Sequence, residues 1–376
     1  MTETPASAPP ETTDPRIPVT LLTGFLGAGK TTLLNALLND ASAGRIAVIV
    51  NEFGEAGLDH DLIETTDEEV VLMQSGCLCC SVRGDLARTI ISLSARRDRG
   101  ELAFDRIVIE TTGLADPGPI LQTLTTDRYL AYGVRMDGVV TVADAANGPA
   151  TLDAQFEAVS QAAMADLIVL SKTDLVSPEQ IVTFEERLRA INPGVRILHS
   201  VKGAGVVGQL WGLSGLRQGA APSEVLAWAR APEPAPDPLA NLSGFAPPGA
   251  APSPMAALPH DSRIGTESIT VDEPIPDTVF DVWLNTLIGL RGPDILRVKG
   301  IVFIEGIEMP FAFHGVQHVI EPPVPLKDWP GDDRRSRIVV IARDISRPEL
   351  QRSLDTLRAR APRDETETAD HEGPAQ

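Results

Sequence analysis

One run of residues, Gly24 to Thr31, constrains the fold of this chain more than any other feature. It reads G-F-L-G-A-G-K-T and satisfies the phosphate-binding pattern G-x-x-x-x-G-K-[ST] at every fixed position. An apolar run from Ile17 to Leu22 precedes it, and Lys30–Leu38, with leucines at helical spacing, follows it. A glycine turn between a strand and a helix presents backbone N–H groups to a phosphate. We therefore expect a nucleotide-binding domain around this turn, and a simple glycine cap on a strand is the weaker alternative.

The polar positions of this P-loop have separate tasks in nucleotide binding. Lys30 is expected to reach the β- and γ-phosphates, and the Thr31 hydroxyl is expected to ligate Mg²⁺. The predicted nucleotide-binding residues of the turn are Gly24, Gly27, Ala28, Gly29, Lys30, Thr31 and Thr32.

Short, nearly continuous apolar runs recur after the P-loop and alternate with segments of helical pattern. The runs are Ile46–Val50, Val70–Met73, Arg106–Ile109, Val139–Val142, Leu167–Leu170 and Val195–Leu198. Strands of this kind are buried on both faces, which is typical of parallel sheets covered by helices. The sequence predicts an α/β fold, a doubly wound and mostly parallel sheet of the P-loop NTPase type.

A second domain is predicted beyond a linker. Nine prolines and no lysine or arginine lie between Ala231 and Asp261, a composition typical of an extended, flexible connection. After Arg263 the order β-α-β-β-β-α predicts a small α+β domain with helices on one face of an antiparallel sheet. The predicted divisions are a disordered tail (1–16), a P-loop domain (17–220), a linker (221–262), an α+β domain (263–361) and an acidic tail (362–376).

Two loops that follow strands are candidates for base recognition and phosphate sensing. In Ser171-Lys172-Thr173-Asp174, the aspartate can accept hydrogen bonds from N1–H and N2–H₂ of guanine, which adenine does not offer. Ser171, Lys172 and Asp174 are the predicted base-loop residues, with a helix-capping aspartate as the alternative. Glu110-Thr-Thr-Gly113 follows another strand, where Glu110 would hold Mg²⁺ through water or orient the attacking water. Gly113 would bring a backbone N–H to the γ-phosphate, so Lys30, Glu110 and Gly113 form the predicted catalytic set.

The three cysteines of the chain all lie within Cys77-Leu78-Cys79-Cys80. Three in four residues form no disulfide framework, and thiolates suit Zn²⁺, Cu(I) or Co²⁺ better than Mg²⁺. Three protein ligands leave a fourth position open, which suits transfer of a metal better than a permanent structural zinc site. A redox switch is the main competing interpretation, although a disulfide between cysteines so close together would be strained.

The net charge of −20 disfavours binding to nucleic acid or to anionic membranes. No apolar run approaches the roughly 20 residues that span a bilayer. The first 18 residues lack the basic and apolar regions of a signal peptide, so we expect a cytoplasmic protein.

In combination, these motifs resemble the CobW-type family of P-loop GTPases, which are relatives of the urease and hydrogenase maturation GTPases. The resemblance rests on Gly24–Thr32, Asn51–Glu55, Gly76–Cys80, Glu110–Pro117, Ser171–Asp174 and, in the second domain, Arg297–Gly300, Gly315-Val316, His318, Trp329 and Asp333–Ile341. It implies a CobW C-terminal-like second domain and GTP hydrolysis coupled to delivery of zinc or cobalt to a client metalloprotein. It also implies that Cys77, Cys79 and Cys80 ligate the metal, and that Asn51–Glu55 is a switch in which Glu55 is a further candidate ligand.

Three features depart from that family. Ser171 replaces an asparagine, so we expect a weaker tie between the base loop and the P-loop. The six histidines are scattered, which argues against metal storage, and the N-terminal tail has no cysteine-containing docking motif that would identify a client. His314 and His318 would face the same side of a strand, yet polar residues on a sheet face are the better interpretation than a second metal site.

The leading hypothesis is therefore a metallochaperone that binds GTP and Mg²⁺ and carries Zn²⁺ or Co²⁺. A nucleotide-dependent regulatory protein with redox-sensing cysteines is the first alternative, and a small-molecule kinase is the second. The sequence leaves the oligomeric state open, a homo-oligomer included.

Overall fold

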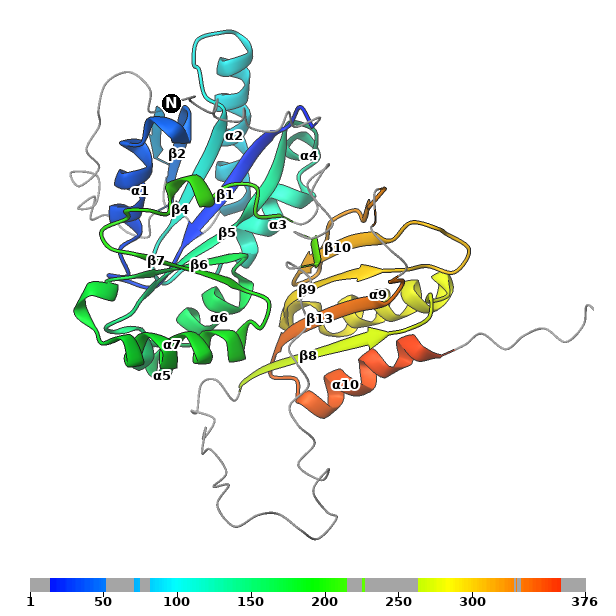
Figure 1. Cartoon of the computed structure of the whole chain (residues 1–376). Helices are drawn as coiled ribbons and strands as arrows, with labels where there is room; N and C mark the ends of the chain where they lie inside the picture. Colours follow the sequence, from blue (N-terminus) through cyan, green and yellow to red (C-terminus); the bar gives the residue numbers. More distant parts are fainter. Residues whose placement is uncertain are drawn as a thin grey trace, which may run out of the picture.

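The computed structural model describes residues 14–51, 71–74, 82–214, 225–226, 263–327, 329 and 333–359. Two sheets, each with its own helices, lie side by side (Figure 1). None of the helices in these ranges combines the length and the apolar character needed to cross a bilayer.

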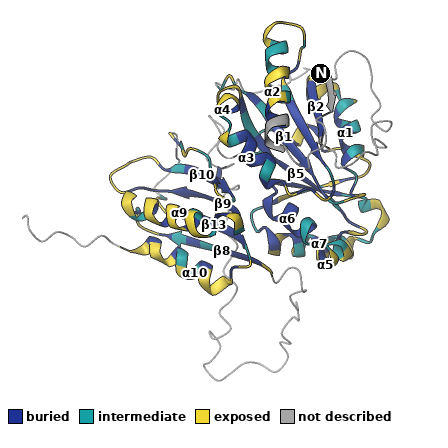
Figure 2. Ribbon diagram, turned by 180° about the vertical axis from the view of Figure 1, so that it is seen from behind, coloured by how far each residue is buried: buried dark blue, intermediate teal, exposed yellow. Residues whose placement is uncertain are grey.

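Within the described residues, the first sheet has seven strands, all parallel, in the order β3-β2-β4-β1-β5-β6-β7. The strands are β1 (Ile17–Thr23), β2 (Ile46–Asn51), β3 (Val71–Gln74), β4 (Arg106–Thr111), β5 (Val134–Asp144), β6 (Leu167–Ser171) and β7 (Arg196–Ser200). Alternate residues serve opposite faces: Ile107 and Ile109 of β4 join one core cluster, whereas Val108 between them joins the other. Because both faces are apolar, helices must cover both, and Figure 2 shows the strands buried between them.

Helices of the first domain divide between those two faces. Leu33, Leu34 and Leu37 of α1 pack with Val108, and Leu86, Ile90 and Leu93 of α2 pack with Ile107. The helices are α1 (Lys30–Leu38), α2 (Val82–Asp98), α3 (Gly118–Thr126), α4 (Arg128–Gly133), α5 (Gly148–Ala154), α6 (Phe156–Met164) and α7 (Pro178–Ile191). The predicted doubly wound fold is confirmed.

The second sheet is antiparallel, with its main strands in the order β11-β10-β9-β13-β8. Its elements are β8 (Ile264–Val271), α9 (Asp277–Arg291), β9 (Ile295–Val302), β10 (Phe311–Val316), β11 (Val319–Ile320), β12 (Val324–Pro325), β13 (Ser336–Arg343) and α10 (Arg347–Asp355). Phe280 and Trp283 of α9 and Leu350 of α10 share one core with Ile338 and Val340 of β13. The expected α+β domain, with helices on one face of its sheet, is confirmed.

The opposite face of the second sheet packs on the first domain. Leu296, Val339 and Ile341 belong to the same buried cluster as the core of the parallel sheet. Within this apolar contact lies a buried ion pair between Arg297, 1% exposed, and Asp166, and the Arg297 guanidinium also donates to the Met164 carbonyl at the end of α6. A buried pair of this kind requires its partners in register, so it fixes how the two domains meet.

Other ionisable side chains surround this pair. Burial raises the pKa of Glu321 to about 7, and the nearby Asp166 carboxylate adds to the shift. Burial lowers the pKa of Lys299 to about 7 and that of His314 to about 3, in both cases assisted by the Arg297 charge. The domain contact therefore holds groups whose charge is costly, and its stability depends on pH.

Substitution Glu321→Gln is expected to remove part of that pH dependence. Between pH values of about 4.5 and 7 the folded chain holds a proton that the unfolded chain releases, so the contribution of Glu321 to the free energy of unfolding falls as pH rises. The fall is about 3 kcal/mol at most. Urea unfolding should show the variant gaining stability relative to the wild type between about pH 5 and pH 7.5. Parallel pH curves for the two proteins would contradict the shift, and the exposed Glu308→Gln serves as control.

Candidate functional site

The predicted site residues gather at the carboxyl edge of the parallel sheet. Leu22 of β1 lies in register with Glu110 of β4, and Asp144 of β5 lies in register with Ser171 of β6. The loops after these four strands therefore leave the sheet side by side, at the edge where open α/β sheets bind ligands.

The P-loop backbone depends on glycine at its first position. Gly24 has φ +142°, and a Cβ there would lie 2.3 Å from the carbonyl oxygen of Val142. Gly29, with φ +99°, is the N-cap of α1. The Lys30 ammonium donates to the carbonyls of Gly24 at 2.9 Å and Phe25 at 3.2 Å. It therefore lies inside the glycine turn, where the phosphates are expected to bind.

Thr31 and Glu110 bring two oxygen atoms together. The Thr31 hydroxyl donates to Glu110 Oε1 at 3.1 Å, and Glu110 is only 6% exposed. An octahedral Mg²⁺ with bonds near 2.1 Å separates adjacent ligand oxygens by about 3 Å. The hydroxyl and the carboxylate thus fit a magnesium ion in chemistry and in spacing. Below them, the Thr111 hydroxyl donates to that of Thr23 at 2.8 Å and ties β4 to β1.

The loop after β4 touches the P-loop directly. A Cβ at Gly113 would lie 2.4 Å from the backbone nitrogen of Leu26, so only glycine fits this approach. Gln161 of α6 holds the same loop from below, because its amide Nε2 donates to the carbonyls of Gly113 at 3.2 Å and Ala115 at 3.1 Å. A change in the P-loop must therefore move this loop or strain it.

The base loop is tied to the P-loop by two side chains. The Ser171 hydroxyl donates to the Ala28 carbonyl at 2.6 Å, and Lys172 Nζ donates to the Gly27 carbonyl at 2.8 Å. A tie at Ser171 is present, because Ala28 comes close enough for the shorter side chain to reach, and its weakness relative to an asparagine stays a prediction. Asp174 follows in a short 3₁₀ turn, Thr173–Leu175, and is exposed.

Asp144 is a residue of this site that the sequence analysis missed. Its carboxylate pairs with Lys172 at 2.7 Å and accepts hydrogen bonds from the side chain and backbone of Asn147. Burial alone would raise the pKa of Asp144, but Lys172 and the Asn147 donors outweigh it and lower the pKa. Its position at the end of a strand next to β1 was the available signal.

The predicted metal ligands Cys77, Cys79, Cys80 and Glu55 lie outside the described residues. Within the described part of the chain, no three His, Cys, Asp or Glu side chains form a group that could hold a metal ion. His314 and His318 do not form a site together: His314 Nδ1 lies 3.8 Å from Glu321, whereas His318 contacts Gln122 of α3.

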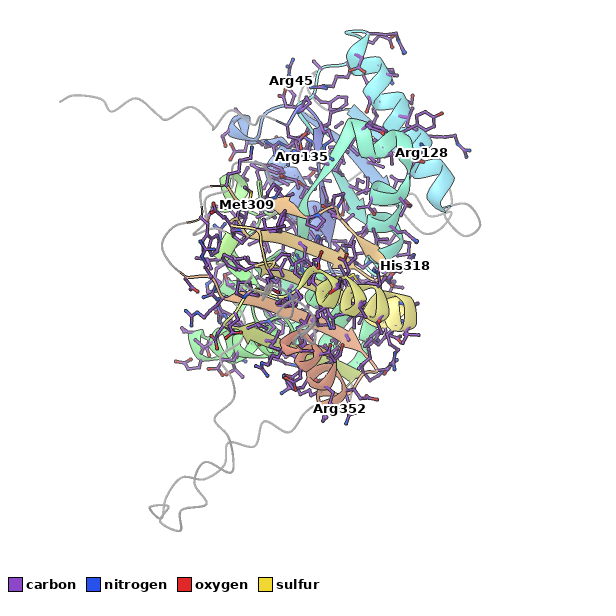
Figure 3. All side chains as sticks on the ribbon, turned by 90° about the vertical axis from the view of Figure 1, so that its right-hand side faces the viewer. Arg45, Arg128, Arg135, Met309, His318 and Arg352 are labelled. Atoms are coloured by element: carbon purple, nitrogen blue, oxygen red, sulfur yellow. The ribbon has the colours of Figure 1, made fainter. Side chains whose placement is uncertain are left out.

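A turn of the second domain contacts the loop that follows Gly113. The Gln317 amide donates to the Asp116 carboxylate at 3.4 Å, and its side chain occupies the space that a Cβ at Gly118 would need. The neighbouring His318 ring bonds the Gln122 amide, and Figure 3 shows His318 where the second sheet meets the first domain. Sequence patterns gave no sign of this contact, because its two sides are about 200 residues apart.

Comparisons with known proteins match both domains. Residues 18–199 match the family model of the CobW/HypB/UreG nucleotide-binding domain, and residues 264–358 match that of the cobalamin synthesis protein cobW C-terminal domain.

Relatives match over most of the chain. The zinc chaperone YjiA of Escherichia coli K12 is 31% identical over 91% of this chain and 99% of its own length. The zinc chaperone CobW of Pseudomonas aeruginosa is 31% identical over 92% of each chain. The crystal structure of Zn(II)-bound YjiA GTPase from E. coli superposes with a TM-score of 0.67 at 28% identity, covering 92% of this chain and 99% of that one.

Substitution Ser171→Ala is expected to weaken nucleotide binding about fivefold, because it removes one partly buried hydrogen bond to the P-loop worth about 1 kcal/mol. Titration with a fluorescent GDP analogue measures the loss. Ser177→Ala is the matched control, since it removes a helix cap of similar value on α7 without touching the P-loop. Equal affinities for Ser171→Ala and the wild type would show that the tie has no part in binding.

Proposed function

This chain belongs to the CobW/HypB/UreG family of nucleotide-binding proteins, and on that premise we propose that it hydrolyses GTP in order to deliver zinc to a client metalloprotein. The observation that carries the proposal is the direct contact among three loops, in which Thr31 meets Glu110 and Ser171 meets Ala28. Such contacts let one bound nucleotide act on all three loops together.

Hydrolysis would use the residues of the P-loop and of β4. Lys30 exchanges its hydrogen bonds to the carbonyls of Gly24 and Phe25 for bonds to the β- and γ-phosphates. The backbone N–H groups of the turn bind the other phosphate oxygens. Thr31 and Glu110 would hold Mg²⁺, which when bound offsets the charge of the phosphates. Water attacks the γ-phosphorus, the bond to the bridging oxygen breaks, and GDP and phosphate leave. The Gly113 N–H donates a hydrogen bond to the γ-phosphate, and the loop is free to move once that phosphate has left.

The base loop would select guanine. Lys172 has φ +57°, a left-handed conformation that turns the chain sharply between β6 and Asp174. Asp174 is exposed, so its carboxylate is accessible to the N1–H and N2–H₂ groups of a guanine ring.

Zinc would be the cargo of the cysteine cluster, with Cys77, Cys79 and Cys80 as ligands and Glu55 as a fourth candidate. Connectivity supports this assignment. Residues 75–81 follow the carboxyl end of β3, residues 52–70 follow that of β2, and both strands end at the edge where the P-loop lies. The names of the relatives favour zinc over cobalt, and soft thiolates accept either ion.

Zinc affinity is expected to depend on both the cysteines and the nucleotide. Isothermal titration of the reduced full chain should show tighter zinc binding with Mg²⁺ and a non-hydrolysable GTP analogue than with GDP. Cys77→Ala, Cys79→Ala and Cys80→Ala should each weaken it at least tenfold, since each removes a thiolate ligand. Ser75→Ala and Ser81→Ala, which flank the cluster, are the controls. Zinc binding that ignores both the cysteines and the nucleotide would contradict the proposal and favour a redox role for the thiols.

Substitution Asp174→Asn tests base selection. An asparagine amide donates where the carboxylate accepted, so GTP affinity should fall at least tenfold, whereas affinity for xanthosine triphosphate, whose C2 carbonyl accepts a hydrogen bond, should rise. Competition against labelled GDP measures both changes, with the exposed Asp153→Asn as control. An unchanged preference for GTP in Asp174→Asn would contradict the role of Asp174 and show that another residue recognises the base.

A further inference from the structure

Arginine recurs where the parallel strands begin. An Arg-Ile pair opens β1, β2, β4 and β7, and an arginine is also the second residue of β5; these arginines are Arg16, Arg45, Arg106, Arg135 and Arg196. Parallel strands all begin at the same edge of their sheet, so these side chains start from its amino edge. A chain whose net charge is −20 thus gathers arginine at one place.

Most of the acidic side chains at this edge are already paired or bonded. Arg16 pairs with Asp14 at 2.7 Å, Arg135 with Asp137 at 3.1 Å and, more loosely, Arg45 with Asp105 at 3.8 Å. Two arginines have no such partner in the described part of the chain. They are Arg106 and, at the start of the neighbouring helix α4, Arg128.

The guanidinium of Arg106 is held in place by an aromatic ring. It stacks over Trp211 at 3.9 Å from the ring centroid, and its Nε is buried without a hydrogen bond. Its two terminal nitrogens also make no hydrogen bond within the described residues, but they are open to solvent because the side chain is only partly buried. Burial lowers the pKa of Arg106, so its charge is incompletely solvated. A carboxylate can accept hydrogen bonds from both terminal nitrogens at once.

Helix α4 adds an aromatic surface beside a second unpaired arginine. Tyr129 and Tyr132, the two tyrosines of the chain, are 79% and 84% exposed. Three residues apart on one helix, they are neighbours on its surface. Arg128 is exposed, and the adjacent Asp127 does not neutralise it, because that carboxylate caps the helix by accepting from the N–H groups of Tyr129 and Leu130. Tyrosine and arginine are the residues that most often dominate protein interfaces.

The two parts belong to one continuous surface. Arg16 Nη1 donates to the carbonyl of Ala131 in α4 at 3.4 Å, which joins the helix to the start of β1. The Arg135 charge acts on Asp14 on one side and on Arg106 on the other. A single extended segment could therefore contact both the tyrosines and the stacked arginine.

We propose that the amino edge of the parallel sheet is a docking surface for an acidic segment of a partner protein, whose carboxylates pair with the two unpaired arginines while an apolar side chain packs on the tyrosines. A nucleic acid or an anionic bilayer presents negative charge over a wide area and would repel the rest of this chain, whereas a short segment meets this edge alone.

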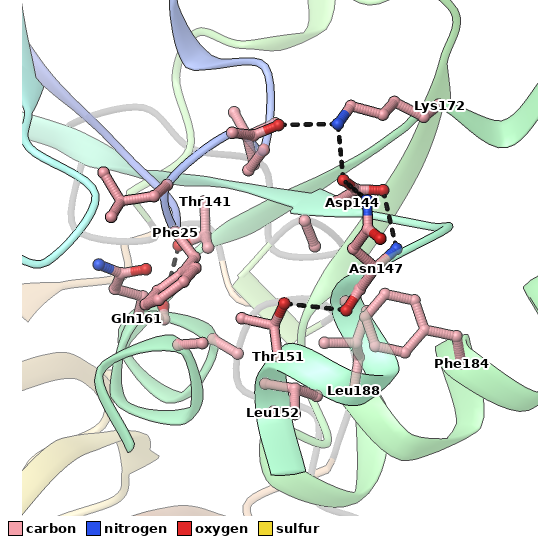
Figure 4. Close-up of a pocket in the computed structure, with 18 residues that line it drawn as sticks. Phe25, Thr141, Asp144, Asn147, Thr151, Leu152, Gln161, Lys172, Phe184 and Leu188 are labelled. Atoms are coloured by element: carbon pink, nitrogen blue, oxygen red, sulfur yellow. Dashed lines mark hydrogen bonds and ion pairs between the residues drawn. The ribbon is translucent and has the colours of Figure 1, made fainter. Parts of the chain in front are cut away.

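The nucleotide loops leave the opposite edge of the sheet, where Figure 4 shows Lys172 paired with Asp144. A docked partner would therefore leave the nucleotide site open. The surface does not depend on zinc delivery, so it stands or falls apart from the proposed function.

A labelled peptide of glutamates around a central leucine serves as the probe, with fluorescence anisotropy of the full chain at low salt as the readout. Arg106→Gln should weaken binding about tenfold, since its bond to a carboxylate is partly buried, and the exposed Arg128→Gln about threefold. Arg352→Gln on α10 is the matched control, because Arg352 is also exposed and unpaired within the described residues; Figure 3 shows it at the far end of the molecule from Arg128.

Unchanged GDP affinity should show that each variant is folded. Peptide affinities of Arg106→Gln and Arg128→Gln that equal that of the wild type, or that fall no more than in Arg352→Gln, would contradict the proposal.

The tyrosines are tested with the same peptide and with one that carries glycine in place of the leucine. Tyr129→Ala and Tyr132→Ala should each weaken the leucine peptide about fivefold and the glycine peptide much less. Leu290→Ala, which removes another exposed apolar side chain, on α9, is the control. Equal losses for the two peptides would contradict packing on the tyrosines. Tighter binding of phosphatidylserine vesicles or single-stranded RNA than of the peptide, lost in Arg128→Gln, would overturn the protein partner.

Discussion

The parallel pairing of β1 with β4 is the constraint on which the rest of the site depends. It sets Leu22 opposite Glu110, so the P-loop and the loop of Gly113 leave the sheet at the same level. Only then can the Thr31 hydroxyl meet the Glu110 carboxylate, and only then does Gly113 come so close to Leu26 that any side chain would collide. The core maintains this register, because alternate residues of both strands pack against different layers of helices and a slip of one residue would exchange the side chains between these two layers.

From this pair of loops a short series of contacts leads to the second domain. Gly113 is bonded by Gln161, Asp116 is bonded by Gln317, and the adjoining His318 reaches α3. Beside them, the buried Arg297–Asp166 pair keeps the second sheet in place. The two domains are thus joined near the loop of Gly113, which in the proposed cycle follows the γ-phosphate. This arrangement gives the proposed GTPase cycle a physical path to the domain that would meet a client.

Sequence patterns predicted the features that depend on local periodicity and on short motifs. The apolar runs of the parallel strands and the P-loop needed no tertiary information, so the fold class was confirmed. Contacts between distant loops were not predictable: the tie at Ser171 is made because Ala28 comes close, Gln161 belongs to no recognisable motif, and the motif residues next to Gln317 did not indicate what that side chain contacts. The spacing of His314 and His318 suggested one shared side, but a turn after β10 separates them. The cysteine cluster stays a prediction, since it lies outside the described residues.

Hydrogen exchange of the wild-type chain tests most directly whether the nucleotide state reaches the second domain. Amide exchange would be compared with Mg²⁺ and a non-hydrolysable GTP analogue against GDP, in peptides covering 110–118 and 311–320. If the contacts of Gln317 and His318 transmit the change, protection in both peptides should change together. A change confined to residues 110–118, with identical exchange at 311–320 in the two states, would contradict coupling between the GTPase site and the second domain.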